Sequence, residues 1–111
     1  MNIANWKDLP DTVINEYATR KVFTGEKGTL VRHVIHPGFP PFPHKHPHEQ
    51  IMVMLEGECD FTVGTEIRRM GPGDVVHVPS DAMHDLQVVG GKPVVNIDVF
   101  IPVREDYIVK K

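Results

Sequence analysis

The chain has 111 residues and a mass of 12.5 kDa, the size of one compact domain. Ten prolines and nine glycines argue against long helical bundles, and a net charge of −3 argues against a nucleic-acid partner. No window reaches the roughly 20 apolar residues of a membrane helix. The single cysteine, Cys59, excludes an internal disulfide, and residues 1–11 lack a basic and apolar leader. We therefore expect a cytoplasmic protein that does not bind membranes.

The first half of the chain begins with a mixed segment, residues 1–20, where the spacing of Val13, Ile14 and Tyr17 allows one helical turn. Two runs rich in β-branched residues follow. They occupy residues 21–24 and 29–35, and the Gly-Glu-Lys-Gly segment between them predicts a hairpin turn. A bend containing four prolines then excludes helix over residues 37–43.

The rest of the chain continues the pattern of short strands between turns. Further strands are predicted at residues 44–55, 60–63, 66–70, 75–78, 86–89 and 94–101. Turn signals recur about every 8 to 12 residues, which is typical of an all-β sandwich or closed barrel. No internal repeat is visible. The sequence therefore predicts a single all-β domain.

Histidine is unusually frequent, with seven in the chain. Alternate residues from 44 to 54 share one face of a strand: His44, His46, His48, Gln50, Met52 and Met54. Two strand histidines, a distant histidine such as His84, and an amide or carboxylate supply three or four ligands for a divalent first-row metal. The alternative is a set of surface or core histidines with ordinary hydrogen bonds.

The other histidines carry no such pattern. His33, His36 and His77 have no partner at metal-ligand spacing, so we assign them ordinary structural roles. His48 stays open, because Pro47 before it can bulge the strand and turn the side chain outward.

The glycines and prolines around these histidines make the pattern specific. Two motifs are present: Gly38, His44, His46, Gln50 and Gly57 in the first, and Gly73, Pro79 and His84 in the second. With these motifs the sequence resembles a small single-domain cupin. The resemblance implies a double-stranded β-helix, or jelly-roll barrel, that binds one divalent transition metal (Ni, Zn, Fe or Mn). The implied ligands are His44, His46, Gln50 and His84.

Two residues depart from the family pattern. Gln50 replaces the usual glutamate ligand, and Val88 stands where an asparagine is expected. The neighbouring Glu49 points to the opposite face of the strand, so Gln50 is the assigned ligand. A ligand set without a carboxylate favours nickel, zinc or iron(II) over harder ions.

The last predicted strand carries a second polar group. Alternation places Ile97, Val99 and Ile101 on one face and Asn96, Asp98 and Phe100 on the other. A carboxylate among apolar neighbours needs a partner or a purpose. One interpretation is an Asp98–Arg104 ion pair that closes the barrel end. The other is a general acid or base at Asp98 with Arg104 clamping a substrate carboxylate.

Residues 98–106 narrow the resemblance to one group within the cupins. Asp98, Phe100, Pro102, Arg104, Glu105 and Asp106 follow the spacing of the pectin-degradation cupins that linearise unsaturated uronates. This resemblance implies conversion of 4,5-unsaturated uronate monomers to linear 5-keto-4-deoxyuronate. It implies that Asp98 and Arg104 are catalytic, and that Phe100, Arg104 and Met52 bind a small carboxylated sugar.

Two other functions stay open: a cupin dioxygenase or cyclase acting on another small molecule, and a non-catalytic cupin that binds a small ligand. The resemblance also implies a homodimer. In that arrangement residues 1–24 pack on, or swap with, the partner, and residues 25–111 form the barrel.

Overall fold

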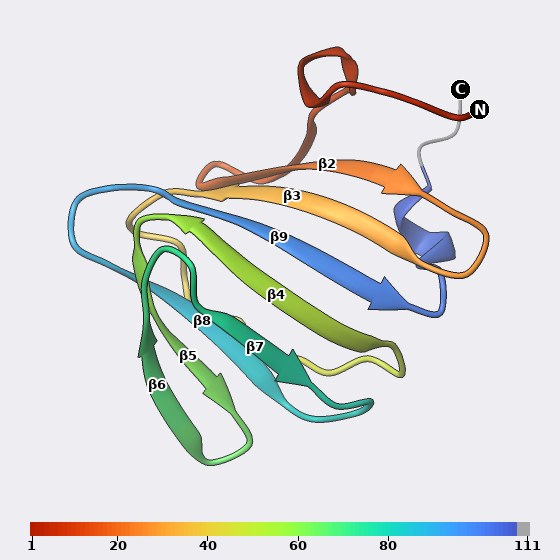
Figure 1. The fold of residues 1–111 in the computed structure, drawn as a ribbon. Helices are drawn as coiled ribbons and strands as arrows, with labels where there is room; N and C mark the ends of the chain where they lie inside the picture. Colours follow the sequence, from red (N-terminus) through yellow and green to blue (C-terminus); the bar gives the residue numbers. More distant parts are fainter. Residues whose placement is uncertain (109–111) are drawn as a thin grey trace.

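Nine strands form two facing β-sheets in the computed structural model, which describes residues 1–108 (Figure 1). The strands are β1 (Thr12–Asn15), β2 (Ala18–Thr24), β3 (Thr29–Ile35), β4 (Glu49–Glu56), β5 (Glu58–Val63), β6 (Glu66–Met70), β7 (Val75–Val78), β8 (His84–Val89) and β9 (Val94–Ile101). Two 3-10 helices, η1 (Trp6–Asp8) and η2 (Glu105–Tyr107), flank them. Within residues 1–108, no helix has the length and apolar character needed to cross a membrane.

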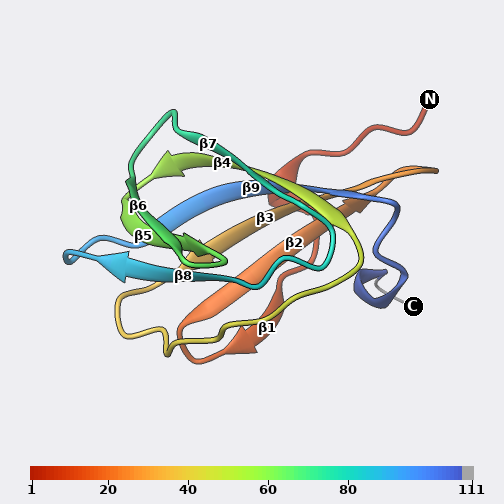
Figure 2. The same ribbon diagram turned by 90° about the horizontal axis from the view of Figure 1, so that it is seen from below.

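The larger sheet has the order β1-β2-β3-β9-β4-β7, and the smaller sheet has the order β6-β5-β8. All strand pairs are antiparallel. The smaller sheet lies across one face of the larger one, as Figures 1 and 2 show from two sides. This arrangement confirms the predicted all-β jelly-roll barrel and places β9 near the middle of the larger sheet, with its inner face toward the interior.

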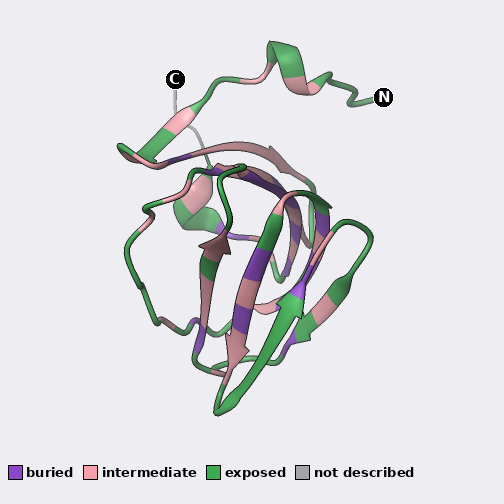
Figure 3. Cartoon of the chain, turned by 90° about the vertical axis from the view of Figure 1, so that its left-hand side faces the viewer, coloured by how far each residue is buried: buried purple, intermediate pink, exposed green. Residues whose placement is uncertain are grey.

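Burial alternates along several strands, among them β3, β4 and β5, as the banded colouring of Figure 3 shows. On β9, Asn96, Asp98 and Phe100 are buried, which confirms the inward face predicted for them. The register places Phe100 opposite Gln50 and Asp98 opposite Met52 on β4. Because opposite residues of an antiparallel pair share a face, β4 and β9 together direct one patch of polar and apolar side chains into the barrel.

The N-terminal segment differs from the prediction of a helical turn. Residues Thr12–Asn15 form strand β1, because three β-branched residues in succession favour an extended backbone. Asn15 Oδ1 then accepts a hydrogen bond of 2.7 Å from the Tyr17 amide, which makes the turn into β2. The predicted hairpin between residues 21–24 and 29–35 is confirmed, with β2 extended back to Ala18.

Part of the segment assigned to a dimer contact therefore belongs to this chain's own larger sheet, since β1 pairs with β2 and β2 pairs with β3. Whether residues 1–24 also contact a second copy stays a prediction. The last residues of the predicted barrel range 25–111, residues 109–111, lie outside the described part of the chain.

Candidate metal centre

Three histidines from two distant segments meet inside the barrel. The ligand nitrogens of His44, His46 and His84 all lie within 4.8 Å of one another. A pair of backbone hydrogen bonds joins the segments: His44 N donates to His84 O at 3.0 Å, and His84 N donates to His44 O at 2.9 Å. The bridge brings residues 40 positions apart to one point, as the motif spacing predicted.

Each of the three rings is fixed by a backbone carbonyl. Nδ1 of His44 lies 2.7 Å from Phe42 O, Nδ1 of His46 lies 2.9 Å from His48 O, and Nδ1 of His84 lies 2.9 Å from Ala82 O. A carbonyl oxygen only accepts, so each Nδ1 carries the ring proton and donates it. The position left for a metal on each ring is therefore Nε2.

The electrostatics of the rings agree with this tautomer. Burial lowers the pKa of both His46 and His84, so these imidazoles stay neutral near pH 7. Nε2 of His84 is fully buried and has no hydrogen-bond partner in the described structure. A buried acceptor nitrogen without a hydrogen-bond donor destabilises the fold, and a bound metal ion would remove this penalty. The three rings therefore fit a divalent metal.

Gln50 lies beside the three histidines, and the orientation of its side-chain amide also favours a bound cation. Its Nε2 donates a hydrogen bond of 2.8 Å to Asp98 Oδ1, so its Oε1 faces the other way, 3.1 Å from His46 Nε2. Because the proton of His46 is on Nδ1, two acceptors face each other at that distance. A metal beside both atoms would satisfy them, which supports Gln50 as a fourth ligand.

A cavity of about 390 Å³ adjoins this group, which is within the size range of small-molecule sites. Of the residues predicted to form the site, seven line it: His44, Gln50, Met52, His84, Asp98, Phe100 and Arg104. Asp98 is only 2% exposed. Its carboxylate accepts hydrogen bonds from Gln50 at 2.8 Å and from Asn96 Nδ2 at 3.0 Å, and it faces His33 Nδ1 at 2.8 Å.

The comparisons with known proteins agree with this site. Residues 31–100 match the cupin domain family. The chain belongs to the cupin family. A solved cupin of the RmlC-like type from Shewanella frigidimarina shares the fold, with a TM-score of 0.89 and 23% identity, over 97% of this chain and 96% of that one. KdgF from Halomonas sp. is similar with a TM-score of 0.83 and 26% identity, over 92% of this cupin and 95% of that chain.

Among curated proteins, this cupin is 49% identical over 45 residues to dimethylsulfoniopropionate lyase DddQ from Ruegeria pomeroyi. The match covers 40% of this cupin and 22% of the lyase. The cupin spans 66% of the length of another matched relative, which has no assigned function.

The histidine segment itself differs from the predicted strand over residues 44–55. Regular pairing begins at Glu49, and His44 makes only an isolated bridge to His84. Pro43 and Pro47 lack the amide proton that a ladder needs, so residues 45–48 leave the sheet. His46 nevertheless reaches the centre, whereas His48, the residue left open, is not one of the three clustered histidines.

The ion pair between Asp98 and Arg104 does not form in the described structure. Arg104 instead donates to Asp106 through Nε at 3.0 Å and through a terminal nitrogen at 2.7 Å. The Arg104 amide is held by Thr29 Oγ1 at 2.8 Å, and Asp106, only two residues away on η2, is the nearer carboxylate. These hydrogen bonds from Arg104 lower the pKa of Asp106, which stays ionised.

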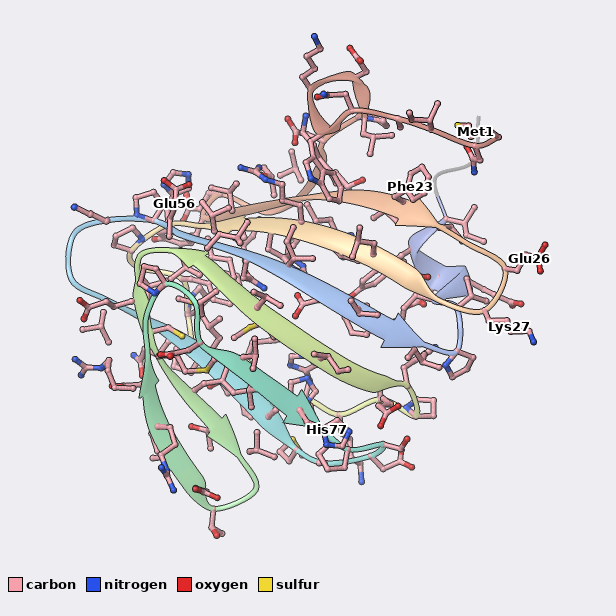
Figure 4. The ribbon with its side chains drawn as sticks, viewed as in Figure 1. Met1, Phe23, Glu26, Lys27, Glu56 and His77 are labelled. Atoms are coloured by element: carbon pink, nitrogen blue, oxygen red, sulfur yellow. The ribbon has the colours of Figure 1, made fainter. Side chains whose placement is uncertain are left out.

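His33, which the sequence analysis assigned an ordinary structural role, lies at the candidate site. It lies on β3, lines the cavity and contacts Asp98. Its alternation with Val31 and Ile35 could have indicated that His33 points inward. The contact with Asp98, however, depends on the pairing of β3 with β9, a long-range contact that alternation does not reveal. The ordinary role assigned to His77 agrees with its place on the surface of β7, where it contacts Glu49 at 2.7 Å (Figure 4).

Proposed function

We propose that this cupin is a metal-dependent enzyme that converts 4,5-unsaturated uronate monomers to linear 5-keto-4-deoxyuronate. The observation that carries the proposal is the buried carboxylate of Asp98, paired with His33 on the wall of a cavity that also holds the three-histidine group. The sequence resemblance to pectin-degradation cupins and the similarity to KdgF from Halomonas sp. support the same proposal.

The reaction is an isomerisation in which one proton leaves the anomeric hydroxyl and one is added at C4. The bond between C1 and the ring oxygen breaks as the anomeric hydroxyl becomes the C1 aldehyde, and the ring oxygen becomes the C5 carbonyl as C4 gains its proton. Asp98 and His33, 2.8 Å apart, form a pair that can hold and deliver a proton inside the cavity. Phe100, which is 3% exposed, offers its ring as an apolar wall for the sugar.

The cavity also has a cationic end for the uronate carboxylate. Arg104 lies there, with its guanidinium carbon 4.7 Å from the centroid of the Phe100 ring. When bound at His44, His46, Gln50 and His84, a divalent metal would supply Lewis-acid polarisation of a substrate oxygen. Met52, paired with Asp98 in the register of β4 and β9, contributes an apolar side chain to the same wall of the cavity.

The test is an assay of the metal-loaded protein with unsaturated galacturonate, followed by the ultraviolet absorbance of the conjugated double bond. We expect Asp98→Asn to lower kcat by about 100- to 10,000-fold, the usual contribution of a general acid or base. The surface variant His77→Gln serves as the control and should keep full activity. Consumption by the metal-loaded wild type no faster than in buffer would refute the proposal, and tight uronate binding without turnover would favour a binding protein.

A second candidate is lyase activity on dimethylsulfoniopropionate, which the 45-residue match at 49% identity to the Ruegeria enzyme favours. This substrate is also a small carboxylate, so it suits the same cationic end of the cavity. Release of dimethyl sulfide by the metal-loaded protein would support it, and its absence alongside uronate turnover would exclude it.

A further inference from the structure

Two arginines stack on one tyrosine beside the cavity. The guanidinium carbons of Arg20 and Arg104 lie 3.8 Å and 3.9 Å from the centroid of the Tyr107 ring. Two guanidinium groups cannot occupy the same face of a ring at such distances, so Tyr107 lies between them. All three residues line the cavity, and the stacking fixes both guanidinium planes by cation–π attraction.

The two cations differ in how their charge is compensated. Arg104 uses its planar fork on Asp106, with two hydrogen bonds to the two carboxylate oxygens. Arg20 makes no ion pair with any acidic group in residues 1–108, and its Nε is fully buried without a hydrogen-bond partner. A buried charged donor without a partner is destabilising, and a carboxylate is the group that removes this cost most completely.

The position of Arg20 links it to the reacting groups. It lies on β2 directly opposite His33 on β3, and His33 contacts Asp98. An anion bound to Arg20 would therefore lie next to the proposed proton-transfer pair, on the side of the cavity that β2 closes. The neighbouring Lys21 points to the other face of β2, where it donates to Trp6 O at 2.8 Å and does not compete.

We propose that Arg20 is the residue that binds the substrate carboxylate, and that Arg104, already neutralised by Asp106, holds Tyr107 and Arg20 in place. Carboxylate binding by Arg20 stands on the contacts above, and only its assignment to a uronate rests on the proposed function. Arg20 is the better receptor because its fork is free, whereas Arg104 would first have to release Asp106.

The experiment is a titration with galacturonate and, as the neutral counterpart, with galactose. Calorimetry gives the affinity, and the Nε–H signals of the arginines, observed by NMR, report which side chain is contacted. We expect galacturonate to shift the Arg20 Nε–H signal, galactose to leave it unchanged, and Arg20→Gln to weaken galacturonate binding by about 10- to 100-fold, the effect of one lost charged hydrogen bond. Arg20→Lys should bind with intermediate affinity because it keeps the charge and loses the fork.

The matched control is Arg32→Gln, which also removes one positive charge. Arg32 precedes His33 on β3, so its side chain lies on the other face of the strand, away from the cavity. This variant should bind galacturonate like the wild type. Equal affinity of Arg20→Gln and wild type, or wild-type protein that binds neither sugar, would overturn the inference. The two proposals fail separately: galacturonate binding through Arg20 without uronate turnover refutes only the function, and turnover with an unchanged KM in Arg20→Gln refutes only the role of Arg20.

Discussion

Gln50 donates its amide proton to Asp98, and this hydrogen bond of 2.8 Å decides which atom of Gln50 faces the histidines. With Nε2 engaged, only Oε1 is left to face His46, at 3.1 Å from Nε2. An acidic residue on β9 thus sets the orientation of a candidate metal ligand on β4. The proposed proton-transfer group and the candidate metal centre are therefore physically coupled.

The coupling predicts that two substitutions of Asp98 differ in their effect on metal binding. Asp98→Asn keeps an acceptor oxygen for Gln50, so zinc affinity should stay within a few-fold of wild type. Asp98→Leu removes the acceptor and frees the amide to rotate, so zinc affinity should fall by about 10- to 100-fold, as is usual when a group that orients a ligand is lost. Competition with a chelating dye measures both, and equal zinc affinity in the two variants would contradict the coupling.

Metal binding should also stabilise the fold. At a free Zn²⁺ or Ni²⁺ concentration of about 100 times Kd, we expect about 2.7 kcal/mol of stabilisation, which raises the Tm of a domain of this size by roughly 10 °C. His84→Ala should abolish this rise, because it removes a buried ligand. His77→Ala removes a surface histidine of the same chemistry and should keep it. A similar rise in both variants would place the metal elsewhere.

The metal-free protein should lose stability as the pH falls. Burial lowers the pKa of His46 and His84 in the folded chain, whereas the unfolded chain has the ordinary value of about 6.5. Below about pH 6.5 the unfolded state binds protons that the folded state does not bind, so the free energy of unfolding decreases. Above about pH 6.5 these rings are neutral in both states and the free energy of unfolding keeps its full value. Thermal melts in chelator between about pH 8 and pH 5 measure this loss.

The same melts with His84→Asn provide the control, because this variant lacks one of the two titrating rings. Its Tm should depend less on pH than that of the wild type. A Tm that rises on acidification of the wild type would show that these rings are not the groups that control stability in this range.

Three glycines allow a graded test of the turns. Gly57 has φ of +80°, and a Cβ there would lie 2.4 Å from Pro93 O. Gly73 has φ of +90° but open space around it, and Gly71 has open space and no positive φ. We therefore expect Gly71→Ala to be nearly neutral, Gly73→Ala to cost about 1 to 2 kcal/mol, and Gly57→Ala to cost more. Urea unfolding measures the three, and equal effects would contradict the steric argument.

Much of the fold was predictable because strand formation follows local patterns. The alternation from Val94 to Ile101 predicted both the bounds of β9 and its inward face, and residues 75–78 were also predicted as they are found. The N-terminal β1 was missed because three apolar residues in a short segment fit a helical turn as well as a strand. Only pairing with β2 makes the extended form stable.

The sequence by itself determined the fold class, the family and the residues of the candidate metal centre, because motif spacing and alternation are properties of the chain. The tertiary structure decided the partners of the charged groups. His33 and Asp98 are 65 residues apart and meet only because β3 pairs with β9. Arg104 bonds to Asp106 rather than to Asp98, and Arg20 enters the cavity only because β2 extends the same sheet. Hydrogen bonds and ion pairs depend on distances of a few ångströms, and these are set by long-range strand register.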